Sequence, residues 1–457
     1  MNWKRPVRQP AATVHRSRDR VLGLPELIAI ALGGMVGGGI FTILGVSVAM
    51  VGAWTPLVIA LGGGVAGLAA WSYVKLALYY QDEGATYSFF KRTFYNSPRA
   101  AALIGWWVVF GYISTLALYA YTFSSYAISG FELADEVWLR KLVAGAVILV
   151  FALINIWSVR GMGKLEDLIV YTKLVLLAVI AFVLINRSTL TVRDLAEQQE
   201  PVSILSVMII ASLTFVAFEG FQLVIHAMRE MRNPIRNTPR AIYSAVAVAT
   251  IIYVVIALGA VLAIPFEDIV ERQEYALAAG TSGVLGNWGR ELMVLGALLA
   301  TSSAISGTLF GASRLMAVIA DDGYLPAFVA RRRGHIPTYA IIVMAAMAYV
   351  LIVAGDLRLI LEFGSVTFLL VSFLMAVANF RIRDKTGASV PMALLSIVVL
   401  LGGVGMIFWY EFQTEPAKMV AILLVYFVLS LAAMLYASRA SRAAVPGRPD
   451  TEKGDMS

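Results

Sequence analysis

Long apolar runs recur along the whole chain and are separated by short polar stretches. A helix that crosses a bilayer needs roughly 20 mainly apolar residues. These runs are continuous rather than alternating, which favours helices over the strands of a β-barrel. The pattern predicts an all-α membrane protein with about twelve spanning helices. We expect them near Glu26–Met50, Thr55–Leu78, Arg99–Gly130, Arg140–Trp157, Leu165–Ile185, Ser203–Met228, Arg240–Ile264, Arg290–Ala320, Thr338–Val353, Leu357–Phe380, Val390–Tyr410 and Lys418–Tyr436.

Composition points the same way. Of the 457 residues, 60% are hydrophobic and 14% are charged, whereas about 25% of the residues of a soluble domain are charged. No polar stretch is long enough for a soluble domain, so residues 1–22 are interpreted as a cytoplasmic arm and residues 438–457 as a disordered cytoplasmic tail. The absence of cysteine excludes disulfides, thiol catalysis and cysteine-ligated metals. We expect neither a cofactor nor a bound metal.

The net charge of +7 is explained by topology. When both ends are placed in the cytoplasm, most of the 36 Lys and Arg residues fall in the inner loops and ends, and few fall in the outer loops. This asymmetry is the positive-inside signal of a multi-pass protein of the cytoplasmic membrane. It argues against nucleic acid as a partner and makes the lipid bilayer the expected environment.

The first predicted span contains the stretch LGGMVGGGIF, Leu32–Phe41, half of which is glycine. Glycine inside a helix is about 1 kcal/mol less favourable than alanine. Two interpretations stay open for this stretch alone. Gly33/Gly37 and Gly34/Gly38 have the spacing of close helix packing, and the same residues would also permit an unwound segment that lines a site.

The sixth predicted span adds a second interruption. Glu219 and Gly220 stand in the middle of its apolar run. A carboxylate near the bilayer midplane is unfavourable by roughly 2.5 kcal/mol or more and marks a functional site by default. Interrupted helices at matching places in two halves are the sequence signature of a transporter built from inverted repeats, and the first and sixth spans are five apart.

Three stretches carry a resemblance to a known family. They are GLPELIAIALGGMVGGGIF (Gly23–Phe41), FVAFEGFQLVIHAMREMRNPIRNTPRAI (Phe215–Ile242) and ATSSAISGTLFGASRLMAVIADDGYLP (Ala300–Pro326). With them the chain resembles the amino acid–polyamine–organocation superfamily of permeases. The resemblance implies a leucine-transporter-like fold with 5+5 inverted repeats. The repeats would be residues 23–186 and 203–382, joined by an external loop at 187–202 and followed by helices 11 and 12 at 383–437.

The resemblance also implies secondary active transport of an amino acid by alternating access, with proton coupling. An amino acid/amine or polyamine exchanger is the alternative. A channel-like carrier is less favoured because no span has a filter-like loop. An enzyme is not expected, because the sequence has three histidines, no cysteine and no nucleophile motif. The substrate, the direction of transport and the oligomeric state are not predicted.

A broken helix offers amide N–H groups to an anion and carbonyl groups to a cation, which suits the two charges of an α-amino acid. We expect the amides of Gly37, Gly38 and Gly39 to bind the carboxylate. Carbonyl groups near Met35, Val36 and Phe218 would bind the ammonium. The side-chain pocket is predicted from Ile40, Phe218, Glu219 and Phe221, and alignment of Gly105-Trp106 with the family pattern adds Val109 and Phe110.

Two buried charges have several interpretations. Glu219 would bind a cationic substrate group, carry the coupled proton, or pair with a basic residue as structure. Lys173 lies well inside the fifth span and would either extend towards the membrane surface or replace a sodium ion between helices 1, 5 and 8, as the resemblance implies. Three residues of helix 8 would face it: Thr301, Ser302 and Ser303. Near the cytoplasmic end, Arg314, Asp321 and Asp322 are interpreted either as an inner gate or as a solvated turn.

Overall fold

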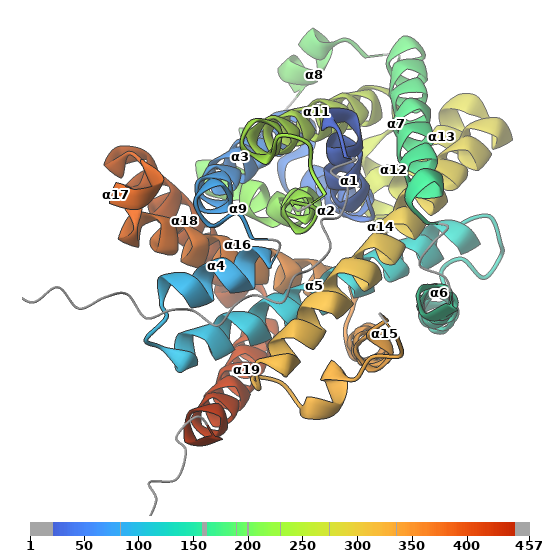
Figure 1. Ribbon diagram of the computed structural model, residues 1–457. Helices are drawn as coiled ribbons and strands as arrows, with labels where there is room; N and C mark the ends of the chain where they lie inside the picture. Colours follow the sequence, from blue (N-terminus) through green and yellow to red (C-terminus); the bar gives the residue numbers. More distant parts are fainter. Residues whose placement is uncertain are drawn as a thin grey trace, which may run out of the picture.

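The protein is all-helical in the computed structural model, apart from two isolated β-bridges (Figure 1). The structure describes residues 22–82, 84–157, 162–188, 190–198, 201–228, 230–273, 275–334 and 336–443. The longer helices are α1 (Leu24–Met35), α2 (Gly39–Val51), α3 (Thr55–Tyr80), α5 (Pro98–Ile128), α6 (Val137–Trp157), α7 (Met162–Asn186), α9 (Ile204–Leu213), α11 (Pro234–Ala263), α14 (Asn287–Asp321), α15 (Thr338–Ala354), α16 (Leu357–Arg381), α18 (Val390–Thr414) and α19 (Pro416–Ala443). Shorter elements are η1 (Gly52–Trp54), α4 (Ala85–Thr93), α8 (Val192–Gln198), η2 (Thr214–Phe218), α10 (Leu223–His226), α12 (Phe266–Glu271), α13 (Ala276–Leu285), η3 (Ala327–Ala330) and α17 (Arg383–Thr386).

Every predicted span contains a helix. Within the described residues, ten helical stretches are long and apolar enough to cross a membrane, and α1 and α15 are shorter apolar helices. One of the ten, Gly38–Tyr80, holds both α2 and α3, which are separated at Gly52, where φ is 51°. The multi-pass architecture is therefore confirmed. The predicted arm and most of the predicted tail lie outside the described residues, and α19 continues to Ala443.

The two spans that contain interruptions are not continuous helices. The first consists of α1 and α2, and the sixth consists of α9, η2 and α10. These segments pack with α3 and α11 on one side of the molecule, where α3 also contacts η2 and α1 also contacts α10. A second group, α5, α6, α14 and α15, packs beside it, while α7 and α16 bridge the groups and α18 and α19 lie outside (Figure 1).

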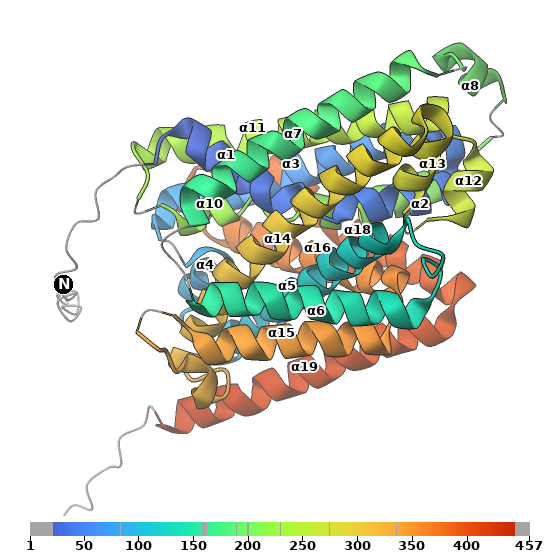
Figure 2. The ribbon, with the colours of Figure 1, turned by 90° about the vertical axis from the view of Figure 1, so that its right-hand side faces the viewer.

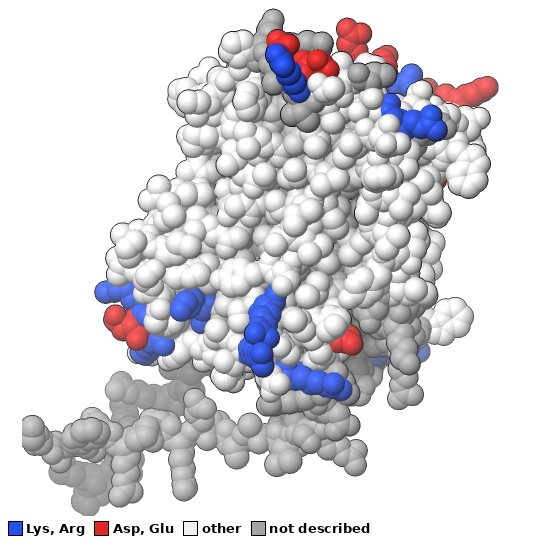
Figure 3. Space-filling view, turned by 90° about the horizontal axis from the view of Figure 1, so that it is seen from above, with Lys and Arg blue, Asp and Glu red and all other residues white. Residues whose placement is uncertain are grey.

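The surface is that of a protein embedded in lipid. Lysine, arginine and acidic residues gather at two opposite ends, and a broad band of other residues separates them (Figure 3). Large apolar side chains such as Leu149, Phe182 and Phe427 are exposed, which is favourable against hydrocarbon. The start of α1 and the end of α19 lie at the same end of the molecule, and α8 and α13 lie at the other (Figure 2).

Candidate functional site

The first helix is broken over Val36–Gly38, as predicted. The helix α1 ends at Met35, Val36 turns away from helical geometry with ψ 75°, and α2 begins at Gly39. The amide of Gly37 donates back to the carbonyl of Met35 at 2.9 Å. The last carbonyl groups of one helix and the first amides of the next have no partner in their own helix, so the break exposes both kinds of group.

The sixth span is broken at Glu219–Gln222, also as predicted. Glu219 is extended, with φ −63° and ψ 135°, and Gly220 has φ 124°, a region that residues with a side chain rarely adopt. The amide of Gly220 donates to the side-chain oxygen of Gln222 at 3.2 Å. A Cβ on Gly220 would lie 2.5 Å from the carbonyl carbon of Gly34. The two breaks therefore contact each other through glycine.

Two tyrosines from other helices hydrogen-bond the carbonyl groups that the breaks set free. The Tyr119 hydroxyl on α5 donates to Gly34 O at 3.0 Å. The Tyr253 hydroxyl on α11 lies 2.7 Å from Met35 O and 3.0 Å from Ala217 O, so it connects both broken spans. Sequence reasoning missed both tyrosines. Their only signal was a hydroxyl inside an apolar helix, and many tyrosines of this chain share it.

Lys173 lies between the three helices for which it was predicted. Its side chain is fully buried, with 0% exposure. The Nζ atom donates to Val36 O at 2.7 Å and to Gly33 O at 3.2 Å, and it lies 3.4 Å from Ser303 Oγ on α14. The interpretation as a side chain that extends to the membrane surface is therefore wrong. The Nζ atom therefore contacts the break of the first span directly, and its proposed replacement of a sodium ion stays a prediction.

The three predicted hydroxyls of helix 8 are placed differently from one another. Ser303 contacts Lys173, as above. The Thr301 hydroxyl donates to Ala297 O of its own helix at 2.7 Å, because a threonine in a helix readily bonds the carbonyl four residues earlier. Ser302 is half-buried, and the structure gives it no bond to Lys173. The rotation of α14 therefore presents one of the three hydroxyls to the ammonium group.

The glycines of the first break serve close packing as well as unwinding, so the two interpretations left open by the sequence hold together. A Cβ on Gly37 would lie 2.7 Å from Ala304 Cβ of α14, and one on Gly38 would lie 2.8 Å from Thr122 Oγ1 of α5. A Cβ on Gly39 would lie 2.7 Å from the backbone of Ala217. These faces are covered by protein, so a ligand can reach only amide groups. The Gly37 amide is already bonded to Met35 O, which corrects its predicted contact with a carboxylate and leaves the amides of Gly38 and Gly39.

Glu219 is buried beside the break with 3% exposure. In the part of the chain that the structure describes, its Oε1 has no hydrogen-bond partner and no lysine or arginine forms an ion pair with it. The side chains close enough for electrostatic interaction include Tyr73, Tyr112 and Tyr119. The interpretation as half of a structural ion pair is therefore wrong, and an uncompensated buried carboxyl group remains.

The apolar residues predicted for the pocket divide into two sets. Ile40, Phe218 and Phe221 are buried at the breaks, and the ring of Phe218 lies 5.3 Å from that of Tyr253. Phe110 instead packs its ring against Phe363 of α16 at 5.7 Å. On α5 it is Tyr112, Tyr119 and Thr122 that contact residues of the two breaks.

Val109 is buried and stands one helical turn before Tyr112, on the same side of α5. The prediction for Phe110 is therefore corrected, because its position on the helix turns it towards α16.

At the end of the molecule where α1 begins and α19 ends, Asp322 connects α14 to α4. Its carboxylate accepts a hydrogen bond from the Tyr87 hydroxyl at 2.6 Å and pairs with Lys91 at 2.7 Å. Burial, followed by the hydrogen bond to this carboxylate, raises the pKa of Tyr87, so the hydroxyl keeps its proton. Asp321 pairs with Arg332 at 2.9 Å, and the guanidinium of Arg314 stacks on the ring of Phe310.

One family model and several known transporters are similar to this chain. A family model described as amino acid permease matches residues 22–445. The chain is 28% identical over 384 residues to the inner membrane transport protein YbaT of Escherichia coli, which covers 84% of this chain and 88% of that protein. It is 24% identical over 455 residues to the methylthioribose transporter of Bacillus subtilis, with 94% of this chain and 96% of that protein covered.

A solved structure, the manganese transporter of Eremococcus coleocola in complex with an aromatic bis-isothiourea compound, matches with a TM-score of 0.61 at 12% identity. The match covers 91% of this chain and 95% of that one. This likeness concerns the fold alone, and it confirms the leucine-transporter-like architecture.

Proposed function

Because this chain belongs to the amino acid permease family and is therefore a secondary transporter rather than an enzyme, we propose that it carries amino acids by alternating access with proton coupling. The cytoplasmic membrane is the proposed location, with both chain ends inside, since the basic residues are concentrated on that side of the predicted topology. The family name supports amino acids as substrates, while one relative carries methylthioribose by its name.

The proposed substrate site lies at the two breaks. The carboxylate of the amino acid binds the first amides of α2, at Gly38 and Gly39, where the helix dipole favours an anion. Its ammonium binds the carbonyl group of Phe218. Met35 O, the other predicted acceptor, already accepts from the Tyr253 hydroxyl and from the Gly37 amide, which uses both of its lone pairs.

The observation that carries the coupling proposal is the Lys173 ammonium, buried and bonded to Gly33 O and Val36 O. A buried amine is a group whose proton can be lost and regained. Loss of the proton would remove the charge that holds the end of α1 in place. Protonation and the position of this break are therefore proposed to be coupled, with Ser303 as a further contact.

Uptake by reconstituted liposomes tests the proposal. Labelled amino acids are offered under an inward proton gradient, an inward sodium gradient and no gradient. We expect saturable accumulation with the proton gradient. The Lys173→Gln variant should keep exchange but lose dependence on the gradient, because glutamine can still donate to Val36 O and carries no titratable proton.

Lys141→Gln is the matched control, since its exposed amine also donates to a carbonyl, that of Val353, at 2.9 Å. Accumulation driven by sodium alone, or a gradient response unchanged in Lys173→Gln, would overturn the coupling proposal. Failure of every amino acid to compete for uptake would overturn the substrate class. Gradient-independent counterflow in the wild type would favour the amino acid/amine or polyamine exchanger.

A further inference from the structure

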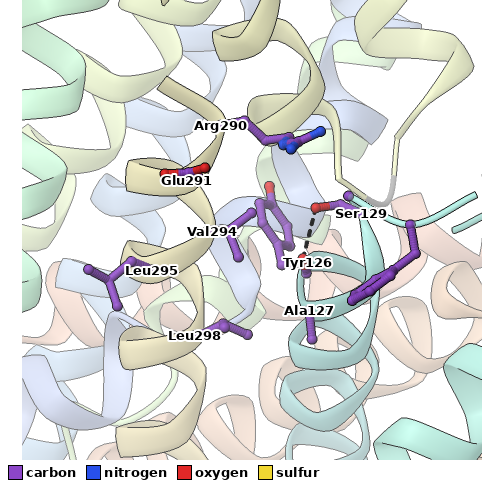
Figure 4. A pocket seen from close by; sticks show the side chains of 10 residues that line it. Tyr126, Ala127, Ser129, Arg290, Glu291, Val294, Leu295 and Leu298 are labelled. Atoms are coloured by element: carbon purple, nitrogen blue, oxygen red, sulfur yellow. Dashed lines mark hydrogen bonds between the residues drawn. The ribbon is translucent and has the colours of Figure 1, made fainter. Parts of the chain in front are cut away.

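A cavity of about 390 Å³ lies between the end of α5 and the start of α14, away from the two breaks (Figure 4). Its walls come from the last turn of α5, the following loop and the first turns of α14. The residues used below are Tyr126, Phe131, Arg290, Glu291 and Leu295. The cavity is at the end of the molecule that carries α8 and α13 (Figure 2), which is the outer side in the proposed orientation.

Two polar groups at this cavity have no hydrogen-bond or ion-pair partner among the residues that the structure describes. Tyr126 is fully buried, yet its hydroxyl has no hydrogen-bond partner among the described residues; the backbone of Leu277 lies near it without reaching hydrogen-bond geometry. Arg290 forms no ion pair and no hydrogen bond with any described residue. Its Cζ lies 3.5 Å from where a Cβ of Gly130 would stand, and Figure 4 shows the guanidinium and the Tyr126 hydroxyl at the same opening.

A carboxylate stands next to this cation. Glu291 follows Arg290 on α14 and is exposed at the edge of the cavity, and the two side chains do not pair with each other. An unpaired guanidinium with a hydroxyl donor fits a phosphate. The Glu291 carboxylate, which also lines the cavity, fits an ammonium. The cavity therefore offers complementary partners to a zwitterion that carries both charges.

The other residues used here that line the cavity are apolar, and two of them are exposed on the surface of the protein. Val294 and Leu298 follow Glu291 on α14. Leu295 and Phe131 are 52% and 68% exposed, and exposed side chains of this kind face lipid in a membrane protein. A freely dissolved zwitterion gains nothing from this wall, whereas an acyl chain buries it at about 0.8 kcal/mol per CH₂ group.

Two tryptophans place the cavity at the depth of the lipid headgroups. Trp138 at the start of α6 and Trp288 at the start of α14 are 57% and 77% exposed. Exposed tryptophan concentrates at the membrane–water interface, where its ring meets apolar and polar surroundings together. Arg290 is two residues from Trp288, so its charge lies at the level of the phosphates.

We propose that this cavity is a binding site for a zwitterionic aminophospholipid, phosphatidylethanolamine. The phosphate binds the Arg290 guanidinium and accepts a hydrogen bond from the Tyr126 hydroxyl. The ammonium binds the Glu291 carboxylate, and one acyl chain lies along Val294, Leu295 and Leu298. The site is separate from the transport site, so its test is independent of transport.

Native mass spectrometry of the delipidated full-length protein measures the binding directly. The probes are phosphatidylethanolamine, phosphatidylglycerol and phosphatidylcholine with identical acyl chains, together with soluble phosphoethanolamine. We expect phosphatidylethanolamine to bind most tightly and Arg290→Gln to weaken it about tenfold, the effect of one charge-assisted contact. Glu291→Gln should remove the preference over phosphatidylcholine, whose quaternary ammonium donates no hydrogen bond. Arg187→Gln, an exposed arginine at the same end of the molecule, is the control and should bind like the wild type.

The Tyr126→Phe variant separates binding from a structural role. The hydroxyl has no partner in the described protein, so its removal should leave the lipid-free protein as stable as the wild type or more stable, while lipid binding falls several-fold. A preference for phosphatidylglycerol, equal binding of all three lipids, equal binding by soluble phosphoethanolamine, or an Arg290→Gln variant indistinguishable from the control would each overturn the proposal.

Discussion

The hydroxyl of Tyr253 lies within hydrogen-bond distance of a carbonyl group in each broken span, so the Tyr253→Phe substitution tests how the breaks are held. Tyr253 is fully buried on α11, and its hydroxyl lies 2.7 Å from Met35 O and 3.0 Å from Ala217 O. Phenylalanine keeps the ring and its contact with Phe218. The substitution therefore removes a donor without opening a large cavity.

Removal of the hydroxyl affects the two carbonyl groups unequally, because they differ in the other hydrogen-bond donors that they have. Met35 O retains the bond from the Gly37 amide at 2.9 Å. Ala217 O has no other donor among the described residues. The amide of Gly220, three residues further on, donates to the Gln222 side chain instead. An orphaned buried acceptor is unfavourable by about 1–3 kcal/mol, and double-mutant cycles in a membrane protein average about 0.6 and reach about 1.7. We expect a loss of about 1–2 kcal/mol, which raises the ratio of unfolded to folded protein about five- to thirtyfold.

Equilibrium unfolding by a denaturing detergent in mixed micelles measures this loss, since thermal unfolding of large proteins is often irreversible. Tyr243→Phe is the control: the same substitution on the same helix at a side chain that is 39% exposed. Substrate uptake should fall as well, because the breaks lose a hydrogen-bonded link and keep only their packing contact through Gly34 and Gly220. If Tyr253→Phe unfolds at the same detergent fraction as Tyr243→Phe, the proposed tie between the breaks does not hold.

Three further substitutions probe the breaks and a buried ion pair. Gly220→Ala should destabilise the fold by at least about 2 kcal/mol in the same unfolding assay, because its φ of 124° and the backbone of Gly34 leave no room for a Cβ. Gly402→Ala is the control and should be neutral, because a Cβ there meets nothing within 4 Å. Equal stability of the two variants would contradict this reasoning. Glu219→Gln should weaken competition by cationic amino acids about tenfold with little effect on neutral ones; uniform loss would instead indicate proton handling. Arg358→Gln should lower stability by up to about 3 kcal/mol, because the Nε of Arg358 donates to the buried Glu362 carboxylate at 2.8 Å. The double variant with Glu362→Gln should recover part of the lost stability. An Arg358→Gln variant as stable as the wild type would show that the pair contributes nothing.

The sequence alone determined where the spans lie and which two are broken. Span length follows from the thickness of the hydrocarbon, and this requirement acts on each segment separately. The breaks at Val36 and Gly220 were indicated by local sequence, because clustered glycine weakens a helix and a carboxyl group in an apolar run marks a functional site. For Lys173 the sequence left two interpretations open, and the structure decided for burial.

The tertiary structure alone decided which side chains satisfy the breaks. Tyr119 and Tyr253 bond carbonyl groups that are 85 and 218 residues away in sequence, and nothing in their own helices distinguishes them from other buried tyrosines. The choice of Tyr112 over Phe110, and of Ser303 over Thr301, depends on the rotation of α5 and α14 about their axes. That rotation is set by packing against several neighbouring helices at once, and a single apolar segment carries too little pattern to specify it.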